Sequence, residues 1–562
     1  MKGFSYFGRL LVFLSFLQPC LLYAAVPDAV EAPTAMVVTA HPDATQIGLS
    51  ILKAGGNAVD AALGVAFALS VVEPFGSGIG GGSFSVYRDA KSGEVFALDG
   101  REEAPAGLTT ASFHPDGTYD SDLARWSGLA VGVPGMVLAM HDLHRRFGKL
   151  DFEACLKPVV EMSRRGTLVT RRLEGRIKRV SSKFRKDAKA IFQPGGMTPK
   201  PGSLLVQSEQ ANTIERISKE GPEAFYSGDI AQKIVEAVQG AGGVMTLQDL
   251  QAYKPRWREP ISGKWNGLNV YSFPPPSSGG AVLMRLLHGV GSGADLKVSG
   301  WNSASTVHVL VELMKRAYAD RNYLLADPDH VKVPLERFVP PEAGQKDRKA
   351  VTRRATPAKK ILNPKKLMKE RPHTSHFSIV DGEGNALSQT QTINLTFGSG
   401  IVAAGTGILL NNEMDDFATA PGKQNAFGLV QGSANAVEPG KRPLSSMTPT
   451  IVVRGDKVEA VVGSPGGSFI ITSVFQTILN FYVFGMSPSE AVCMPRIHHQ
   501  WLPDYIQAEP YALSADSALK LAKKKHLVHE SHEFGNVQAI FRTESGWAGA
   551  PDCRGEGHAA GF

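Results

Sequence analysis

The sequence has few cysteines and, beyond its N-terminal segment, no apolar stretch long enough to cross a membrane. Of four cysteines in 562 residues, Cys155, Cys493 and Cys553 lie outside that segment, so at most one disulfide can form among them. A disulfide framework is thereby excluded as the basis of the fold. The apolar stretch 61–72 falls short of the roughly 18 residues that a spanning helix needs. We expect a soluble mature protein with no membrane span.

The N-terminal segment itself has the pattern of a secretory signal peptide. Lys2 and Arg9 precede the apolar stretch 10–22, which ends at the small residues Ala24 and Ala25. A charged start, a short apolar region and small residues at its end indicate cleavage there. We expect residues 1–24 to be removed and the protein to be exported, either to a periplasm or out of the cell. An uncleaved membrane anchor is the alternative.

Positive charge is concentrated in one stretch of the chain. The formal net charge is +7, yet residues 345–373 alone hold eleven Lys and Arg against two acids, which leaves the rest of the chain at −2. No aromatic residues alternate with these bases and no nucleic-acid motif is present, so we expect no nucleic-acid partner. The stretch is interpreted as a solvated, flexible linker.

Glycines 76, 78 and 81 satisfy the spacing of a dinucleotide-binding loop, but their context is inverted. That loop follows a strand and opens a helix, whereas here a helical pattern precedes the glycines and the strand pattern 83–88 follows them. We therefore expect no nucleotide cofactor and interpret the loop as a place where only glycine permits close backbone contact. No Cys or His spacing indicates a zinc site, and His498 and His499 are interpreted as structural.

Periodicity divides the chain into helical and extended regions. A second strand pattern lies at 95–98, and strand patterns return after residue 374, at 386–394, 408–410 and 458–462. Helical patterns occur at 42–52, 58–72, 135–166, 208–242, 281–289, 303–325 and 469–484.

Thr374 begins a strand pattern directly after the basic stretch. If the bond after His373 were cut, Thr374 would carry both a hydroxyl nucleophile and a free α-amine with an unperturbed pKa of about 7.7 to 8.0. One residue could then act as nucleophile and general base. The strand 386–394 would pair with it through the turn 382–385 and set Thr392 beside Thr374. A simple capping hydroxyl is the alternative.

Three further segments offer groups for binding and catalysis. Clustered acids follow the strand at 408–410, and they would either lie on the surface or pair with a substrate ammonium. The turn 463–468 precedes a helix, where free backbone N–H groups suit an oxyanion hole, although a plain strand-helix connection also fits. Arg101 ends a strand pattern, where an Arg forms a surface ion pair or holds a carboxylate.

Taken together, residues 374–376, 411–417, 442–447 and 463–468 resemble the γ-glutamyltransferase (γ-glutamyltranspeptidase) family. Residues 80–82, Arg101 and 496–503 extend the resemblance from about residue 35 to the C-terminus. It implies an α+β fold of the N-terminal nucleophile class, with four layers in which helices enclose two stacked antiparallel sheets. It also implies self-cleavage between His373 and Thr374 into a large subunit, 25–373, and a small subunit, 374–562, that remain together as one intertwined domain.

The resemblance also implies roles for individual residues. Thr374 would be the nucleophile and Thr392 would orient it, while Gly466 and Gly467 would supply the oxyanion hole. The glutamyl α-carboxylate would be held by Arg101, Ser445 and Ser446, and its ammonium by Asn394, Glu413 and Asp416. The glutamyl group of glutathione would pass through a Thr374 ester to water or to an amino acid or peptide acceptor, with no cofactor or metal.

Two positions depart from the family pattern. Phe427, in the expected lid loop 421–439, stands where some bacterial relatives have Tyr, and Ser375 replaces a second Thr. Two alternatives remain. One keeps the fold but acts on cephalosporin-type acyl groups or poly-γ-glutamate, against which the charged head-group residues and the lid argue. The other is a protein that binds γ-glutamyl compounds without catalysis.

Overall fold

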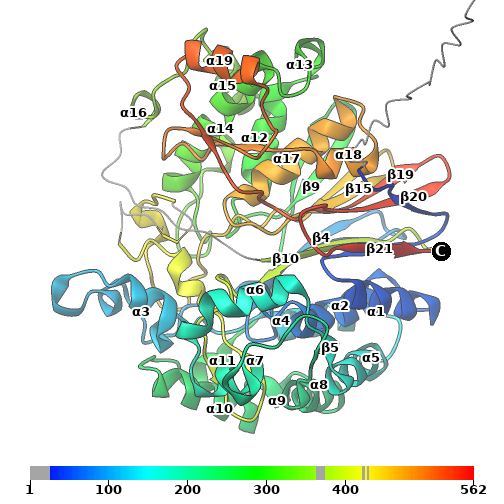
Figure 1. The fold of residues 1–562 in the computed structure, drawn as a ribbon, viewed down its shortest axis with the longest axis vertical. Coiled ribbons are helices and arrows are strands. Elements are labelled where there is room, and N and C mark those ends of the chain that lie inside the picture. The colour runs from blue at the N-terminus through cyan, green and yellow to red at the C-terminus, as the bar shows by residue number, and fades with distance from the viewer. Residues whose placement is uncertain (1–25, 363–373, 421–424, 427–428) are drawn as a thin grey trace, which may run out of the picture.

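Two seven-stranded antiparallel sheets, A and B, lie at the centre of the structure, with helices on both outer sides (Figure 1). The computed structural model describes residues 26–362, 374–420, 425–426 and 429–562. Sheet A has the strand order β1 (Val30–Ala32), β20 (Gly546–Pro551), β19 (Gln538–Thr543), β15 (Lys457–Gly463), β14 (Thr450–Arg454), β9 (Leu268–Ser272) and β8 (Ile261–Trp265). Sheet B has the order β21 (His558–Gly561), β2 (Met36–Thr39), β10 (Ser375–Val380), β11 (Ala386–Thr392), β3 (Gly82–Arg88), β4 (Val95–Gly100) and β7 (Arg256–Arg258).

Strand β10 divides its side chains between two environments. Phe377 and Ile379 are buried against the helices on the outer face of sheet B. His376 and Ser378 point the other way, toward sheet A, where the Ser378 hydroxyl donates to the Gln538 carbonyl at 2.9 Å. Because side chains alternate along a strand, Thr374 belongs to this inner face. The expected four-layer α+β arrangement is confirmed, with Thr374 entering the space between the sheets.

The outer helices of sheet B form where the periodicity predicts them. A capping box joins Asn57 and Asp60 at the start of α2, and every residue of that helix is buried. An almost uncharged, uniformly apolar segment is stable only in such a position, between a sheet and further helices. The larger helices on this side are α1 (Pro42–Lys53), α2 (Ala58–Val72), α4 (Met136–Phe147), α5 (Phe152–Arg165), α8 (Ser208–Glu220) and α10 (Asp229–Gly240).

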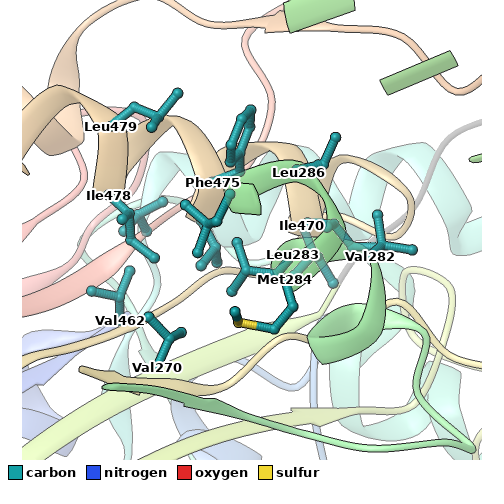
Figure 2. Close-up of a cluster of buried hydrophobic side chains, with 14 of the residues drawn as sticks. Val270, Val282, Leu283, Met284, Leu286, Val462, Ile470, Phe475, Ile478 and Leu479 are labelled. Carbon is teal, nitrogen blue, oxygen red and sulfur yellow. The ribbon is translucent and has the colours of Figure 1, made fainter. Parts of the chain in front are cut away.

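A second set of helices covers sheet A. Figure 2 shows side chains of α12 and α17 meeting above Val270 of β9 and Val462 of β15. Ile470, in the first turn of α17, belongs to this buried cluster, which ties the helix start to the core. The helices on this side are α12 (Gly279–Val290), α13 (Ala294–Ser299), α14 (Ala304–Leu324), α15 (Pro341–Lys349), α16 (Ala358–Ile361), α17 (Phe469–Tyr482), α18 (Pro488–Cys493) and α19 (Ala515–Lys523).

The glycine loop before β3 is packed against backbone, as the sequence predicts. A Cβ atom on Gly80 would lie 2.2 Å from the Leu409 carbonyl oxygen, and one on Gly81 would lie 2.0 Å from the Thr392 carbonyl oxygen. Neither distance is possible for a real side chain, so glycine is required at both positions. The loop thereby fixes the end of β11, where Thr392 lies.

The flexible linker predicted for residues 345–373 is wrong for its first part. Residues 341–349 form helix α15, in which Asp347 pairs with Arg285 of α12, with an Oδ2–Nε distance of 2.6 Å. Further along, the Thr356 carbonyl and N–H bond to Lys315 and Glu312 of α14, respectively. Buried side chains on α12 and α14 thus hold this part of the basic stretch against the protein, although its composition alone predicted exposure to solvent. Residues 363–373, including His373, lie outside the described part.

The structure decides the cysteine pairing, which the sequence left open. Cys493 and Cys553 form one disulfide, and Cys155 is free and buried. Within the described residues, no helix combines the length and apolarity needed to cross a bilayer. Residues 1–24, which the sequence predicts to be a signal peptide, lie outside the described residues.

Candidate active site

Thr374 lies at the edge of an open cavity at the start of β10, with roughly 320 Å³ of empty space that includes its solvent-filled mouth. Ser375 pairs with Gln391 across the β10–β11 ladder, which puts Thr374 opposite Thr392. Their hydroxyl oxygens are 3.5 Å apart. The Thr392 oxygen accepts the Asn394 N–H at 2.8 Å, which leaves the Thr392 proton free to donate to Thr374. The hairpin and the neighbouring hydroxyl predicted from the sequence are confirmed.

The acids after β13 (Ile408–Leu409) are buried, not on the surface. Asn411 fixes their backbone, because its side chain accepts from Gly132 and Glu413 N–H groups and donates to the Gly80 and Gly132 carbonyls. The following turn, Glu413–Asp416, brings Glu413 and Asp416 to the cavity.

Arg101 connects these acids to the end of β4. It is 1% exposed, and its guanidinium pairs with Glu413 and, at 2.7 Å, with Asp416. Burial raises the pKa of Glu413 to about 8 despite Arg101, and it raises the pKa of Asp416 well above its ordinary range. Asn394 completes the group. Its side-chain oxygen is buried and accepts no hydrogen bond within the described residues, so it is available to a ligand donor.

Ser445 and Ser446 lie on the opposite wall, in the loop before β14. The Ser445 hydroxyl oxygen accepts the Met447 N–H at 3.1 Å, and the Ser446 hydroxyl oxygen accepts from Arg321 at 2.9 Å. Each hydroxyl therefore keeps its proton for a further acceptor. The loop is held in place by the buried Arg442, which pairs with Asp99 and Glu103. Two hydroxyl donors side by side suit a carboxylate.

The turn before α17 completes the wall beside Thr374. Gly466 and Gly467 have φ angles of +133° and +55°, which favour glycine. Their N–H groups donate to no acceptor within the described residues, while their carbonyls cap the first turn of α17. Gly467 lines the cavity, whereas Gly466 is not among the lining residues. Free N–H groups at a helix start can stabilise negative charge.

Several cavity residues were missed in the sequence. Arg321, in the last turn of α14, carried no motif and was assigned to a covering helix. Leu429 of the expected lid loop also lines the cavity, whereas Phe427 lies outside the described residues. Apolar spacing gives no sign of which side chain at a helix end faces a cavity. The remaining residues that were missed are Leu444, Met447, Ser468 and Ile470.

The histidines next to these elements are structural. His376 bonds to Thr390 at 2.8 Å, and burial lowers its pKa to about 3. His498 bonds to Thr472 and Gln500 and is also kept neutral by burial, as expected from sequence. The tertiary structure also gathers Asp60, His144 and Cys155.

That last cluster was not predicted from spacing. Its oxygens already have partners, because both carboxylate oxygens of Asp60 accept backbone N–H groups, from Asn57, Lys149 and Leu150. Asp60 therefore functions as a helix cap, and its Oδ1 also lies 3.1 Å from His144 Nε2.

A threonine at the start of a central strand, facing a cavity between two antiparallel sheets enclosed by helices, defines the N-terminal nucleophile hydrolase class. The crystal structure of a cephalosporin acylase from Bacillus halodurans is similar over 97% of this chain and 99% of its own, with a TM-score of 0.83 and 29% identity. A Helicobacter pylori γ-glutamyltranspeptidase chain matches 58% of this chain and 92% of its own, with a TM-score of 0.54 and 33% identity.

Sequence comparison narrows this class to one family. The family model described as gamma-glutamyltranspeptidase matches residues 44–562. A glutathione hydrolase proenzyme of Escherichia coli K12 is 42% identical over 517 residues, covering 91% of this chain and 89% of the relative. The chain belongs to the γ-glutamyltranspeptidase family.

Proposed function

We propose that this protein cleaves itself between His373 and Thr374 and then transfers γ-glutamyl groups from glutathione and related amides to water or to amino acid and peptide acceptors. The observation that supports this proposal is that one cavity is lined by Thr374, by arginines and by acidic residues. An amino acid head group bears a carboxylate and an ammonium. In this cavity a γ-glutamyl amide would place its γ-carbonyl at Thr374, with its α-carboxylate beside the arginines and its α-ammonium beside the acids.

Self-cleavage creates the reactive group. The Thr374 hydroxyl attacks the His373 carbonyl, the peptide bond becomes an ester, and water releases Thr374 with a free α-amine. Residues 25–373 and 374–562 then form the large and small subunits of a heterodimer. Their interlocking is supported by sheet B, where β10 pairs with β2 on one side and β11 pairs with β3 on the other. The subunits therefore share one core and stay together.

Turnover uses the same hydroxyl. The α-amine takes the Thr374 proton as the oxygen attacks the γ-carbonyl, and Thr392 orients that oxygen. Gly466 and Gly467 N–H groups stabilise the tetrahedral oxyanion. The C–N bond then breaks and the proton passes to the leaving amine, cysteinylglycine when glutathione is the donor. Water or an acceptor amine attacks the γ-glutamyl ester, its proton returns through the Thr374 amine, and free Thr374 is restored.

In the binding roles, Ser445, Ser446 and Arg101 hold the α-carboxylate. The ammonium lies against Asn394, Glu413 and Asp416. Two buried acids beside the cavity favour substrates that carry a free ammonium over cephalosporin-type acyl groups without one, such as glutaryl. Leu429 on the cavity wall favours small donors over a long poly-γ-glutamate chain. We also propose that residues 1–24 direct export.

A denaturing gel and a substrate panel test the proposal. We expect purified mature protein to give two bands, the smaller beginning at Thr374, and to release p-nitroaniline from γ-glutamyl-p-nitroanilide with an initial burst. Thr374→Ala should remain one uncut band without turnover. An uncut wild-type chain with full activity would overturn the mechanism, and binding without a burst would favour a non-catalytic binding protein. Faster turnover of glutaryl amides or poly-γ-glutamate than of glutathione would favour the alternative substrates.

A further inference from the structure

Among the four fully buried arginines, Arg321 alone has no carboxylate partner in the described part of the chain. Arg101, Arg442 and Arg496 are each 1% exposed or less, and each has a carboxylate oxygen within ion-pair distance. Arg321 is equally buried at 1%, yet no carboxylate lies within 4.0 Å of it in the described part of the chain. A buried charge without a counter-charge costs several kcal/mol. Asp416 acts on Arg321 only from beyond that distance and itself pairs with Arg101, so the place of Arg321 on the cavity wall indicates a ligand that supplies an ion-pair partner.

All hydrogen bonds of Arg321 go to neutral oxygens. Nε donates to the Ser278 hydroxyl at 3.0 Å, Nη1 to the Asn322 side chain at 3.2 Å, and Nη2 to the Ser446 hydroxyl at 2.9 Å. These contacts fix the plane of the guanidinium without neutralising it. Burial lowers the pKa of Arg321 to about 10, so it stays charged at neutral pH. The contact with Ser446 leaves that hydroxyl proton directed at another acceptor.

Arg101 is in the opposite situation. Its guanidinium already faces Glu413 and Asp416, and Glu102 lies 3.7 Å away. The Arg101 guanidinium therefore has three carboxyl groups within 4.0 Å before a substrate arrives, whereas the Arg321 guanidinium has none among the described residues. An anionic group entering the cavity is attracted by the uncompensated charge.

We infer that Arg321 is a specificity-determining residue of this site, which orients the Ser446 hydroxyl and supplies the positive charge that selects substrates with an α-carboxylate. The inference rests on the proposed function and divides the head-group site into two halves. Arg321 and the serines recognise the carboxylate. Arg101 connects the two halves, because it lies on the carboxylate side of the proposed site and also pairs with Glu413 and Asp416.

Three p-nitroanilides separate these halves. The γ-glutamyl amide has both charges, the glutaryl amide has only the carboxylate, and the 4-aminobutyryl amide has only the ammonium. We expect Arg321→Met to lower kcat/KM about 10- to 100-fold, mainly through KM, for the first two. The 4-aminobutyryl amide should change less than about 3-fold. Arg321→Lys, which keeps the charge but loses the planar fork, should restore part of the loss. Where an amide turns over too slowly, its inhibition constant replaces KM.

The matched control is Arg316→Met, on the same helix. Arg316 is also buried but pairs with Glu312 and does not line the cavity. Arg316→Met should lower the melting temperature without changing the ratios of kcat/KM among the three amides. If Arg321→Met fails to mature, Arg321→Lys alone tests the inference. It should still lower kcat/KM selectively for the two amides that carry a carboxylate.

A double-mutant cycle checks the route through Ser446. Arg321→Lys and Ser446→Ala should be non-additive for the glutaryl amide, since each removes part of one contact. Equal losses for all three amides would make Arg321 a purely structural residue, and no loss for any would leave Arg101 as the carboxylate's partner; either result overturns the inference. Failure of the wild type to act on the γ-glutamyl amide would instead refute the proposed function.

Discussion

The Thr392 hydroxyl lies 3.5 Å from that of Thr374 while its oxygen accepts the Asn394 N–H. This arrangement leaves the Thr392 proton free for Thr374, and we propose Thr392 as the donor of the contact. Because β11 bends away at Asn394, whose φ is +71°, the same turn sets both the hydroxyl of Thr392 and the side chain of Asn394 in the cavity.

Replacing that donor should slow both reactions of Thr374. We expect Thr392→Val, which keeps the shape and removes the hydroxyl, to reduce kcat roughly 10- to 100-fold and to slow maturation, since one hydrogen bond to the nucleophile is lost. Thr392→Ser keeps the hydroxyl and should remain within a few-fold of the wild type. Steady-state assays measure kcat, and a time course of the two subunit bands on a denaturing gel measures maturation. Equal rates for the Val and Ser variants would contradict the assigned donor.

The glycine loop offers a second test with its own control. Gly81→Ala would place a Cβ 2.0 Å from the Thr392 carbonyl oxygen, so the end of β11 must shift and activity should fall by about 10-fold or more. Gly78→Ala, in the same loop, meets no atom closer than 3.5 Å and should be nearly neutral. Kinetics and thermal unfolding of both variants decide this. An active, stable Gly81→Ala protein would refute the packing.

Glu102 should make stability depend on pH. It is fully buried, and burial raises its pKa to about 7 although Arg101 lies nearby. Between an unfolded pKa of about 4.3 and the folded value, the native state binds more protons than the unfolded chain, so this carboxyl's contribution to stability falls as pH rises through that window. The loss amounts to roughly 3 kcal/mol.

Glu102→Gln removes this titration because an amide stays neutral. Its melting temperature relative to the wild type should therefore increase between about pH 4.5 and 7 and level off above. Calorimetric scans over that range measure the difference. A difference that stays constant with pH would show that Glu102 is already ionised in the folded protein.

The disulfide provides a stability test away from the cavity. Cys493 and Cys553 are 60 residues apart in sequence, and a loop of that length corresponds to about 4 kcal/mol in the chain-entropy account. We expect the double variant Cys493→Ser and Cys553→Ser to melt several degrees lower, with kcat close to wild type. A reducing agent should lower the melting temperature of the wild type only. Equal sensitivity of both proteins to the reductant would argue against this pairing.

Much of the fold could be predicted because local patterns agree with burial. The all-apolar segment 58–72 and the alternation at 374–380 each allow one stable environment, a covered helix and a strand between two layers. The pairing of β10 with β11 could be predicted because the short turn 382–385 joins the two strands. The basic stretch failed as a predictor for residues 345–362, because Arg285, Glu312 and Lys315, distant in sequence, hold it.

The sequence by itself determined the nucleophile's strand, the glycine turns and the family to which the chain belongs, because each depends on neighbouring residues. Only the tertiary structure decided the charge balance of the cavity. Arg101 and Arg321 look alike in sequence, yet one faces two carboxylates and the other faces neutral oxygens. Which charges meet depends on how β4, α14 and the loop at 413–416 are brought together, and the electrostatic energy of a buried group is set by those neighbours.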